Sequence, residues 1–345
     1  MRLSARCNRA RPGYRGAPRL WHWNARPDYC YHPLWPPRPV PDALTLAESP
    51  MRRIHLSALA LALALAPLAA CGDGLGGLLI SYDQELEIGA GVDLQMRQDN
   101  ALIDPSDPVS AWAAELVAPL AQASSTFRDP AEIGGYKVAV IADDELVNAF
   151  AGPGGFTYIS TGLILQAESC AEIAGVMGHE LGHVTERHGV KQLEAAYAVS
   201  VISNWFLGEG LANDAAQTIY LFFQSTQFSQ DHESEADSVG LQIAFGAGYN
   251  PFGLVDFFAK LLALQGSIEV PEFLSSHPPT DDRIAASEKE IQRRYGATVV
   301  EGTTQTYGCV GTALTLEQVK ARILGGVTLL PGTGQGAAPA IPATP

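Results

Sequence analysis

The chain has 345 residues, of which 47% are hydrophobic and 17% charged, and its formal net charge at pH 7 is −15. This length and composition allow one sizeable hydrophobic core with a small appendage, and they exclude disorder as the default state. The acidic balance argues against nucleic acid as a partner, because phosphates need a basic protein surface.

The first 50 residues differ from the rest of the chain. They contain eight Arg and nine Pro and show no apolar period that would form a helix or strand. We therefore expect residues 1–50 to be a leader that is disordered or not part of the native protein. Directly after them come Met51, Arg52 and Arg53, then an apolar run over residues 58–70 and then Cys71.

This order matches the basic region, apolar region and processing site of a bacterial signal peptide, which makes Met51 a plausible true start. The apolar run is shorter than the roughly 20 residues that a membrane-spanning helix needs, so we expect residues 51–70 to be cleaved.

Residues 68–71, Leu-Ala-Ala-Cys, resemble the bacterial lipobox, in which the cysteine is lipidated and becomes the new N-terminus. A lipidated Cys71 would anchor the protein to a membrane without spanning it. The alternative is an ordinary secretory signal with an incidental cysteine. Gly72 stands where an Asp commonly retains lipoproteins in the inner membrane of enteric bacteria. The sequence therefore favours a lipid-anchored protein of the bacterial cell envelope, on the outer membrane and facing the periplasm.

Removal of the first 70 residues makes the chain more acidic. Residues 71–345 contain 12 Lys and Arg against 34 Asp and Glu, a net charge of −22. Such a domain has no basic face for nucleic acid and is held off anionic surfaces.

Two cysteines are left once the leader and the lipobox are set aside. Cys7 and Cys30 belong to the leader and Cys71 to the lipobox, so Cys170 and Cys309 remain. In an oxidising compartment these two are expected to form a disulfide that ties the C-terminal segment to the helix after Cys170. Two buried free thiols are the alternative.

Apolar residues at helical spacing predict a helix at 80–97 and another at 111–123. Two short β-branched and aromatic runs, at 136–141 and 156–161, predict strands of a small sheet, and a Gly- and Pro-rich segment separates them. After Cys170 the pattern is helical and punctuated by glycines, with no internal repeat. The Pro/Gly/Ala-rich tail at 331–345 is expected to be disordered. The further helices are predicted at 171–188, 190–206, 212–225, 230–246, 252–264 and 279–295.

An HExxH motif lies in the helix predicted at 171–188. His179 and His183 are four residues apart, so they project from one helical face and can bind one metal ion. Glu180, one position further round the helix, can reach a water at the metal without being a ligand. The apolar neighbours give this helix a buried side, which favours neutral imidazole ligands. The alternative is a pair of core histidines satisfied by hydrogen bonds. His188 faces away from His179 on a continuous helix, so we expect it to hydrogen-bond near the helix end, as does Arg187.

A catalytic zinc takes three protein ligands and keeps one position open, so a third ligand must come from elsewhere in the chain. In the helix predicted at 230–246, Glu233 and Asp237 are four apart and share a face, whereas Glu235 points away. We expect Glu233 to be the third ligand, and Asp237 to accept the N–H of a ligand histidine and orient its ring. Acidic residues at a helix start are also common for dipole reasons alone.

These motifs resemble the BepA/LoiP-like periplasmic zinc metallopeptidases, relatives of HtpX and the CAAX prenyl proteases in peptidase family forty-eight of the metallo class. The resemblance rests on HELGHVTERHG, on ESEAD, on NAFAGPGGFTYISTGLI and on SSHPPTDDR, and it covers residues 81–294. It implies an α+β, mostly helical fold: a zincin-like minimal metallopeptidase domain, here residues 71–330, with a small edge-strand sheet packed on the HExxH helix.

The resemblance also implies one Zn²⁺ per chain held by His179, His183 and Glu233, with Glu180 activating the water that cuts a peptide bond. The implied substrates are unfolded or misassembled cell-envelope proteins, bound as an extended strand along the strand at 156–161. An ordinary core strand is the alternative for that segment. The tetratricopeptide array of BepA and the transmembrane helices of HtpX have no counterpart here.

His277 matches a loop histidine that occupies the open zinc position in BepA-like relatives and holds the enzyme latent. A solvated loop histidine is the alternative. Arg283, on the same segment, is a candidate substrate or oxyanion contact, and a surface ion pair is the alternative.

Two other classes of protein share parts of this pattern. A periplasmic chaperone or assembly factor for outer-membrane proteins, with little proteolysis, would carry the same residues and differ only in turnover. An integral-membrane protease is disfavoured, because the best apolar run, at 195–208, is interrupted by polar residues and too short to span a bilayer.

Overall fold

The computed structural model describes residues 79–207, 211, 213–264, 272–278, 280–300 and 305–334. The predicted leader, the signal peptide at 51–70, the lipidation site at Cys71 and residues 335–345 of the predicted tail lie outside this set. Among the described residues, no helix has both the length and the apolar character needed to cross a membrane.

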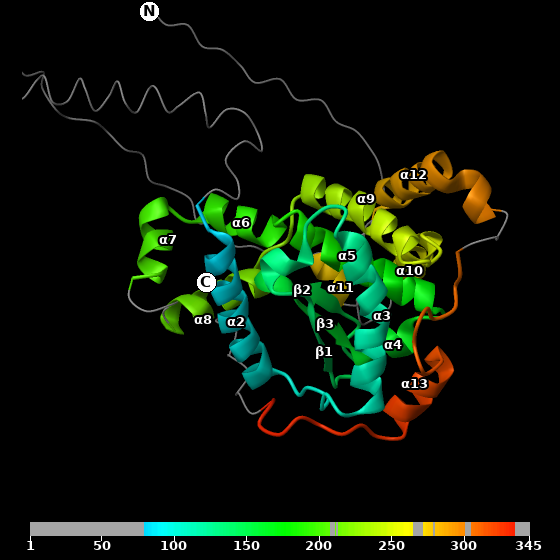
Figure 1. The fold of residues 1–345 in the computed structure, drawn as a ribbon, viewed down its shortest axis with the longest axis horizontal. Helices are drawn as coiled ribbons and strands as arrows, with labels where there is room; N and C mark the ends of the chain where they lie inside the picture. The colour runs from blue at the N-terminus through cyan, green and yellow to red at the C-terminus, as the bar shows by residue number, and fades with distance from the viewer. Residues whose placement is uncertain are drawn as a thin grey trace, which may run out of the picture. The chain divides into compact units, whose positions relative to one another are not determined.

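The centre of the fold is helix α5, Cys170–Thr185, and all of its residues are buried. The hydroxyl of Ser169 caps its N-terminus by accepting the N–H of Glu172. A helix that is buried all round must be covered on every side. Its main neighbours are the helices α3 (Pro108–Ser124), α9 (Gln230–Gly246) and α10 (Phe252–Leu264) and the strand β2 (Ala149–Ala151) (Figure 1).

Helices α5 and α9 approach each other closely because glycines form their contact. A Cβ atom on Gly240 would lie 2.6 Å from the backbone nitrogen of His179, and one on Gly178 would lie 2.8 Å from the carbonyl oxygen of Gly240. Only glycine fits at these two positions. The contact fixes the backbone of the HExxH motif against the helix that carries Glu233 and Asp237.

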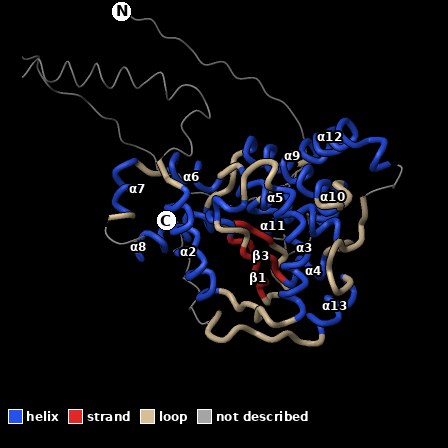
Figure 2. The backbone as a smooth tube through the Cα atoms, in the orientation of Figure 1, coloured by secondary structure: helices blue, strands red, loops and turns tan. Residues whose placement is uncertain are grey.

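The sheet has three strands, β1 (Lys137–Ile141), β2 (Ala149–Ala151) and β3 (Phe156–Ser160), in the order β1-β3-β2. β1 runs parallel to β3, with Lys137 opposite Phe156, and β2 runs antiparallel to β3, with Phe150 opposite Tyr158. The strands lie together among the surrounding helices (Figure 2). The prediction that the segment at 156–161 is the edge strand was wrong, because β3 is the central strand and β2 forms the edge beside α5.

Along β2, the backbone groups of every second residue pair with β3, and those of the residues between them face the opposite edge of the strand. Gly152 donates its N–H to the carbonyl of Phe156, and Ser160 donates to the carbonyl of Asn148, so the even-numbered residues pair with β3. The backbone groups of Ala149 and Ala151 therefore face the other way.

A second apolar cluster lies beside the sheet, where α2 (Tyr82–Asp99) packs near α6 (His188–Ala196), α7 (Val199–Trp205) and α8 (Asn213–Ser225). Ser81 and Gln84 form a capping box at the start of α2. The backbone N–H groups of Leu79 and Ile80 both donate to Glu194 of α6.

Two helices predicted as continuous are broken. The helix predicted at 171–188 ends at Thr185, because Arg187 takes a left-handed backbone conformation with φ 56° before α6 begins. The helix predicted at 190–206 divides into α6 and α7 at Tyr197 and Ala198, which are both extended. Propensity alone gives no sign of the left-handed turn, since a non-glycine residue rarely adopts it.

The C-terminal part contains α11 (Glu272–Ser276), α12 (Asp281–Val300) and α13 (Leu316–Leu324). A disulfide joins Cys170, at the start of α5, to Cys309, and their Cα atoms are 5.0 Å apart. The N–H of Ala171 also donates to the carbonyl of Tyr307, so the segment after α12 is tied to the central helix at two neighbouring points.

The fold class predicted from the sequence is confirmed: the protein is mostly helical with a small mixed sheet. Apart from the helix predicted at 190–206, which is divided, the predicted long helices and the strands at 136–141 and 156–161 match within a few residues. Among the described residues, the sequence patterns missed β2, the helices α4 (Thr161–Gln166), α11 and α13, and two short 3-10 helices at Pro130–Ile133 and Pro153–Gly155.

Candidate metal centre

The side chains of the two histidines of the HExxH motif converge. They project from one face of α5, and the Nε2 atoms of His179 and His183 are 3.1 Å apart. Both side chains are buried. Their positions follow from the i, i+4 spacing together with the tight contact between α5 and α9.

Glu233, on the first turn of α9, places its carboxylate next to these two imidazole nitrogens. Its Oε2 atom lies 3.5 Å from His179 Nε2, and its Oε1 atom lies 3.4 Å from His183 Nε2. Ser229 caps this helix and fixes its first turn, on which Glu233 lies. The structure thus brings together the three residues that the sequence predicted as ligands.

A fourth side chain joins them from the segment after α11. The Nδ1 atom of His277 lies 3.3 Å from His179 Nε2 and 2.9 Å from Glu233 Oε1. His277 is buried, which excludes the solvated loop histidine considered from the sequence. Ligand atoms of His179, His183, Glu233 and His277 all lie within 4.8 Å of one another.

This spacing fits one tetrahedral metal ion. Bonds of about 2.0–2.1 Å from zinc to nitrogen or oxygen in a tetrahedron put ligand atoms about 3.3–3.4 Å apart. The Nε2 atoms of the two histidines are 3.1 Å apart. Oε1 of Glu233 is 3.4 Å from Nε2 of His183, and Oε2 is 3.5 Å from Nε2 of His179. The donor set of imidazole nitrogens and a carboxylate is also one that zinc accepts.

Glu180 lies beside this cluster, and only one of its two carboxylate oxygens accepts a hydrogen bond from the described residues. Its Oε2 accepts the N–H of Ala151 on β2 at 3.0 Å. Its Oε1 is buried, has no hydrogen bond from the described residues and lies 3.4 Å from Nε2 of His277. Burial raises the pKa of Glu180, while His277 and His179 oppose that shift.

Asp237 and Arg283 support the cluster from behind. Asp237 Oδ1 is 2.8 Å from Nδ1 of His179, on the side of the ring opposite the cluster. Arg283 donates through Nε and Nη2 to the two oxygens of Asp237, each at 2.7 Å, and its Nη1 is 2.8 Å from Oε2 of Glu233. These contacts fix the orientation of both carboxylates.

The surface ion pair considered for Arg283 was wrong, because its side chain is only 8% exposed. The guanidinium also lies over the ring of Phe258, 4.8 Å from the centroid, and donates to the carbonyl of Pro278. The guanidinium of Arg283 is thus paired with Asp237 and Glu233 and hydrogen-bonded to the backbone of its own segment.

The other face of His183 meets residues that the sequence did not single out as site residues. Its Nδ1 atom is 3.0 Å from Nδ1 of His188, and its ring stacks on Phe228 with centroids 4.1 Å apart. The Nε2 atom of His188 is 3.0 Å from Oε2 of Glu235. Glu235 points away from the cluster, as expected, and contacts this histidine instead.

Burial and charge act in opposite directions on these groups. Burial lowers the pKa of His183 well below its ordinary value and that of His188 to about 4, which favours neutral imidazoles. For Glu233, burial is outweighed by His277 and His183, so its pKa falls and the carboxylate stays ionised. For His277, burial is outweighed by the carboxylates of Glu180 and Glu233, and its pKa rises.

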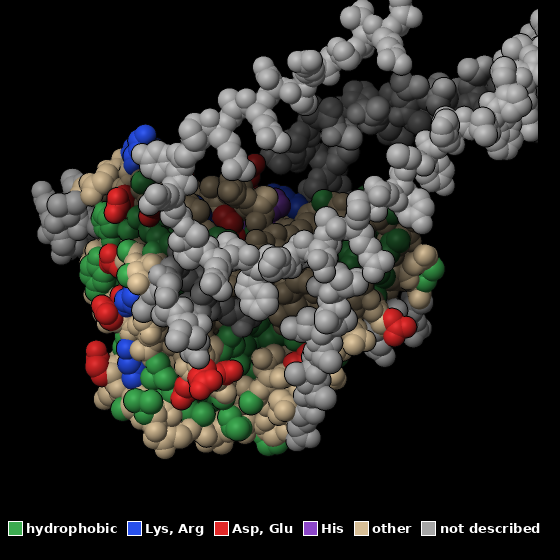
Figure 3. Space-filling view, turned by 180° about the vertical axis from the view of Figure 1, so that it is seen from behind, with side chains coloured by type: hydrophobic (Ala, Val, Ile, Leu, Met, Phe, Trp, Pro, Cys, Tyr) green, Lys and Arg blue, Asp and Glu red, His purple; other side chains and the backbone are tan. Residues whose placement is uncertain are grey.

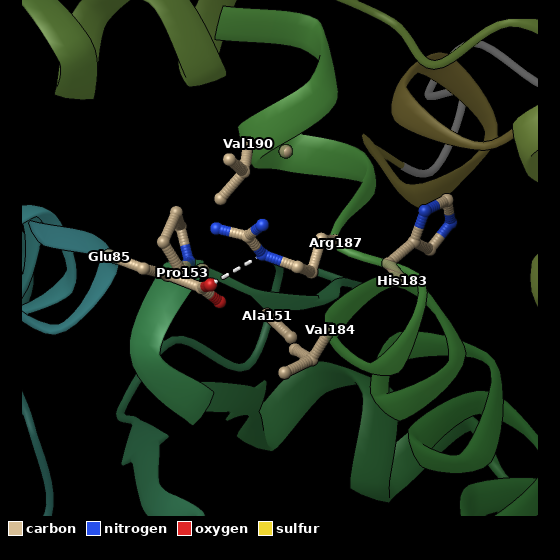
Figure 4. Close-up of a pocket in the computed structure, with 9 residues that line it drawn as sticks. Glu85, Ala151, Pro153, His183, Val184, Arg187 and Val190 are labelled. Carbon is tan, nitrogen blue, oxygen red and sulfur yellow. Dashed lines mark hydrogen bonds and ion pairs between the residues drawn. The ribbon is translucent and has the colours of Figure 1, made fainter. Parts of the chain in front are cut away.

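The cluster itself is buried, and little histidine surface shows in the space-filling view from behind (Figure 3). A small cavity beside His183 lies at the end of β2, and Arg187 extends across it to Glu85 of α2 (Figure 4). The Arg187 Nε to Glu85 Oε2 distance is 2.8 Å, so the left-handed residue after α5 is held by a buried carboxylate.

Comparison with protein families gives a match over the segment that builds this cluster. The model of peptidase family M48 matches residues 109–291, which include α3, the sheet, α5, α9 and His277. The resemblance stated from the motifs is therefore confirmed.

Individual relatives are similar over parts of the chain. The beta-barrel assembly-enhancing protease of Escherichia coli (strain K12) is 28% identical over 223 residues, which are 61% of this chain and 44% of the relative. Metalloprotease YcaL of the same strain is 31% identical over 153 residues, 43% of this chain and 58% of the relative. Mitochondrial metalloendopeptidase OMA1 of Arabidopsis thaliana is 32% identical over 139 residues, 40% of this chain and 28% of the relative. The chain spans less than half the length of the beta-barrel assembly-enhancing proteases that it matches.

Proposed function

The chain belongs to peptidase family M48, and on that premise we propose that it is a zinc-dependent endopeptidase that degrades misfolded or unassembled proteins of the bacterial cell envelope. One observation carries this proposal. Nε2 of His179 and Nε2 of His183 are 3.1 Å apart, and each lies 3.5 or 3.4 Å from one of the two carboxylate oxygens of Glu233, close to the ligand spacing of a tetrahedral zinc. Glu180 lies beside these groups.

Zinc, when bound at this cluster, would supply a Lewis acid that polarises the scissile carbonyl and acidifies the attacking water. Glu180 takes the proton of that water on Oε1 and passes it to the leaving amine. The hydrogen bond from Ala151 holds its other oxygen, so the carboxylate is positioned before the substrate arrives. A pKa raised by burial brings this base closer to neutral pH, where proton transfer in both directions is efficient.

The substrate is proposed to bind along the free edge of β2. The N–H and carbonyl of Ala149 and the carbonyl of Ala151 face away from β3, so an extended peptide can pair with these groups as a further strand while the N–H of Ala151 stays on Glu180. The N–H that Ala151 gives to Glu180 places this edge next to the base. Recognition through the backbone implies weak sequence specificity and a preference for unfolded segments.

His277 is proposed to act as a latch. Its Nδ1 atom lies 3.3 Å from Nε2 of His179 and 2.9 Å from Oε1 of Glu233, so it would occupy the open position that an attacking water needs if zinc were bound there. The same segment also contacts the substrate edge, because Phe273 of α11 donates its N–H to the carbonyl of Val147, just before β2. Release of this segment would free the fourth position and the edge together.

Location at the membrane rests on the sequence before Leu79. We propose that the protein is secreted, lipidated at Cys71 and held on the outer membrane facing the periplasm. The Cys170–Cys309 disulfide supports an oxidising compartment. Cells grown with labelled palmitate should incorporate label into the wild-type chain and none into Cys71→Ala, which should also leave the membrane fraction. Equal labelling of the two would contradict lipidation at this residue.

The decisive test of the enzyme is Glu180→Gln. This change keeps the size of the side chain and removes the base, so bound zinc should stay at one per chain while casein cleavage falls by about 10²–10⁴-fold. Zinc is measured by elemental analysis and cleavage by peptide release, with and without a chelator. Glu87→Gln, on the exposed side of α2, is the matched control and should keep full activity.

Full activity in Glu180→Gln would refute the assignment of the base. Wild-type chain that binds zinc but cleaves neither casein nor an unfolded envelope protein would favour the chaperone or assembly factor instead.

A further inference from the structure

A row of side chains leads from the candidate metal cluster to the protein surface. It starts at His183, continues through His188 and ends at Glu235. The Nδ1 atoms of the two histidines are 3.0 Å apart, and Nε2 of His188 is 3.0 Å from Oε2 of Glu235. His183 and His188 are almost fully buried, whereas the side chain of Glu235 is 48% exposed.

The break between α5 and α6 makes this row geometrically available. On a continuous helix, a residue five positions after His183 would lie about 140° away from it around the axis. The left-handed backbone of Arg187 ends that helix and starts α6 at His188. Arg187 is held in this conformation by Glu85, in the first turn of α2 (Figure 4), and by the carbonyl of Ile80, just before that helix.

The ring of His188 is held in its plane by packing. It stacks on His232 of α9 with centroids 4.3 Å apart and an interplanar angle of 19°. Its plane meets that of the His183 ring at 75°, and the Nδ1 atoms of the two rings are within hydrogen-bond distance at 3.0 Å. Both nitrogens of His188 are thus directed at named partners.

The carboxylate at the surface sets the direction of every hydrogen bond in the row. An ionised carboxylate only accepts, so Nε2 of His188 must carry a proton. A neutral His188 then has a bare Nδ1, which accepts, and Nδ1 of His183 must donate to it. His183 is thereby left with a bare Nε2, and this lone pair faces His179 and Glu233.

If Nδ1 of His188 instead donated to Nδ1 of His183, both nitrogens of His188 would carry a proton. That would put a cation at a side chain with 0% exposure and would leave His183 protonated on Nε2, where it could not bind a metal. The arrangement set by Glu235 avoids both problems.

We propose that His188 is a positioning residue, which fixes His183 in the Nδ1–H form and directs its Nε2 lone pair into the cluster. Glu235 determines which atom donates in each hydrogen bond of the row. This inference rests on the proposed ligand role of His183. It makes the two ligand histidines unequal: His179 is oriented directly by the buried carboxylate of Asp237, at 2.8 Å, and His183 indirectly through a second imidazole.

The first test reads the proton position on His183 directly. The full chain, labelled with ¹⁵N-histidine and free of metal, is measured by long-range ¹H–¹⁵N NMR, and His183 is assigned by the loss of its signals in His183→Asn. The wild-type chain should show the Nδ1–H form of His183, and His188→Phe should show a mixture or the Nε2–H form. The Nε2–H form in the wild-type chain would overturn the proposal.

The second test compares two substitutions at the same position. Asn can present its side-chain oxygen close to the place of Nδ1 and still accept from His183, whereas Phe keeps the ring and accepts nothing. Competition with a chromogenic chelator should show zinc affinity reduced about 10–100-fold in His188→Phe and by less than about threefold in His188→Asn. Equal losses in the two variants would overturn the hydrogen-bonding role.

Folding is followed in the same samples by far-ultraviolet circular dichroism. If His188→Phe does not fold, the wild-type NMR spectrum and His188→Asn still decide the matter. The outcome is separable from that of the peptidase test: an inactive chain with His183 in the Nδ1–H form would refute the enzyme and leave this inference standing. Full proteolysis with the opposite form would refute the inference alone.

Discussion

The candidate metal cluster is built from two unlike regions. Helices α5 and α9 supply His179, His183 and Glu233 from long helices whose backbones touch through Gly178 and Gly240. The fourth side chain, His277, directly follows α11, a helix of only five residues. Along its backbone, the described part of this segment is joined to the sheet by the hydrogen bond from Phe273 to Val147.

This difference suggests a division of labour. On the proposed assignment, a change on the α5–α9 side must move packed backbone, so we expect the ligands there to stay in place. Release of the segment with His277 would break a few hydrogen bonds and withdraw the buried ring of Phe273 from the core, and we expect water to replace His277 when it occurs. The two regions should therefore respond very differently when zinc affinity is measured after single substitutions.

The largest loss of zinc affinity is expected from Gly240→Ala. The added Cβ would lie 2.6 Å from the backbone nitrogen of His179, so α5 and α9 must separate. Overpacking of this kind should cost about 3 kcal/mol of stability and weaken zinc binding by more than about 100-fold. Chelator competition and thermal unfolding measure the two effects.

Gly296→Ala is the matched control for that substitution. Its Cβ would meet only the side-chain oxygen of Gln292, at 3.1 Å, and Ala favours a helix interior. It should raise stability by up to about 1 kcal/mol and leave zinc affinity unchanged. If Gly240→Ala behaves like Gly296→Ala, the tight contact between the two helices does not hold the ligands in place.

A much smaller effect on zinc is expected from His277→Ala. Three protein ligands are enough for a catalytic zinc, so affinity should fall by no more than about tenfold. Basal casein cleavage should instead rise by roughly 3–10-fold, because the closed population loses the contact that favours it. Ser275→Ala, an exposed position on the same short helix, should change neither quantity. Unchanged or reduced proteolysis in His277→Ala would contradict the latch.

The sequence predicted well what depends on local spacing. The HExxH pair and the Glu233 and Asp237 pair each lie on one helical face, and the structure brings their side chains to one place. Hydrophobic periodicity predicted the long helices because each of them buries one face or more. These features need no knowledge of how distant segments meet.

Features that depend on tertiary contacts were missed. β2 has only three residues inside a Gly- and Pro-rich segment, too few for a strand pattern, and the order of the sheet cannot be read from one strand. The contact between His188 and His183 depends on a left-handed arginine held by a buried carboxylate about 100 residues earlier in the chain. Nothing near Arg187 in the sequence predicts that turn, since the residue is not glycine.

The disulfide has a topological consequence for a chain of this kind. Cys170 and Cys309 close a covalent ring, and the four cluster residues together with Glu180, Asp237 and Arg283 lie inside that ring. A single cut of the backbone between the two cysteines, whether by another protease or by a second copy of the protein, would leave both fragments bound to each other. Such a nicked molecule would migrate as one band in an oxidising gel and fall apart into two once its thiols were reduced.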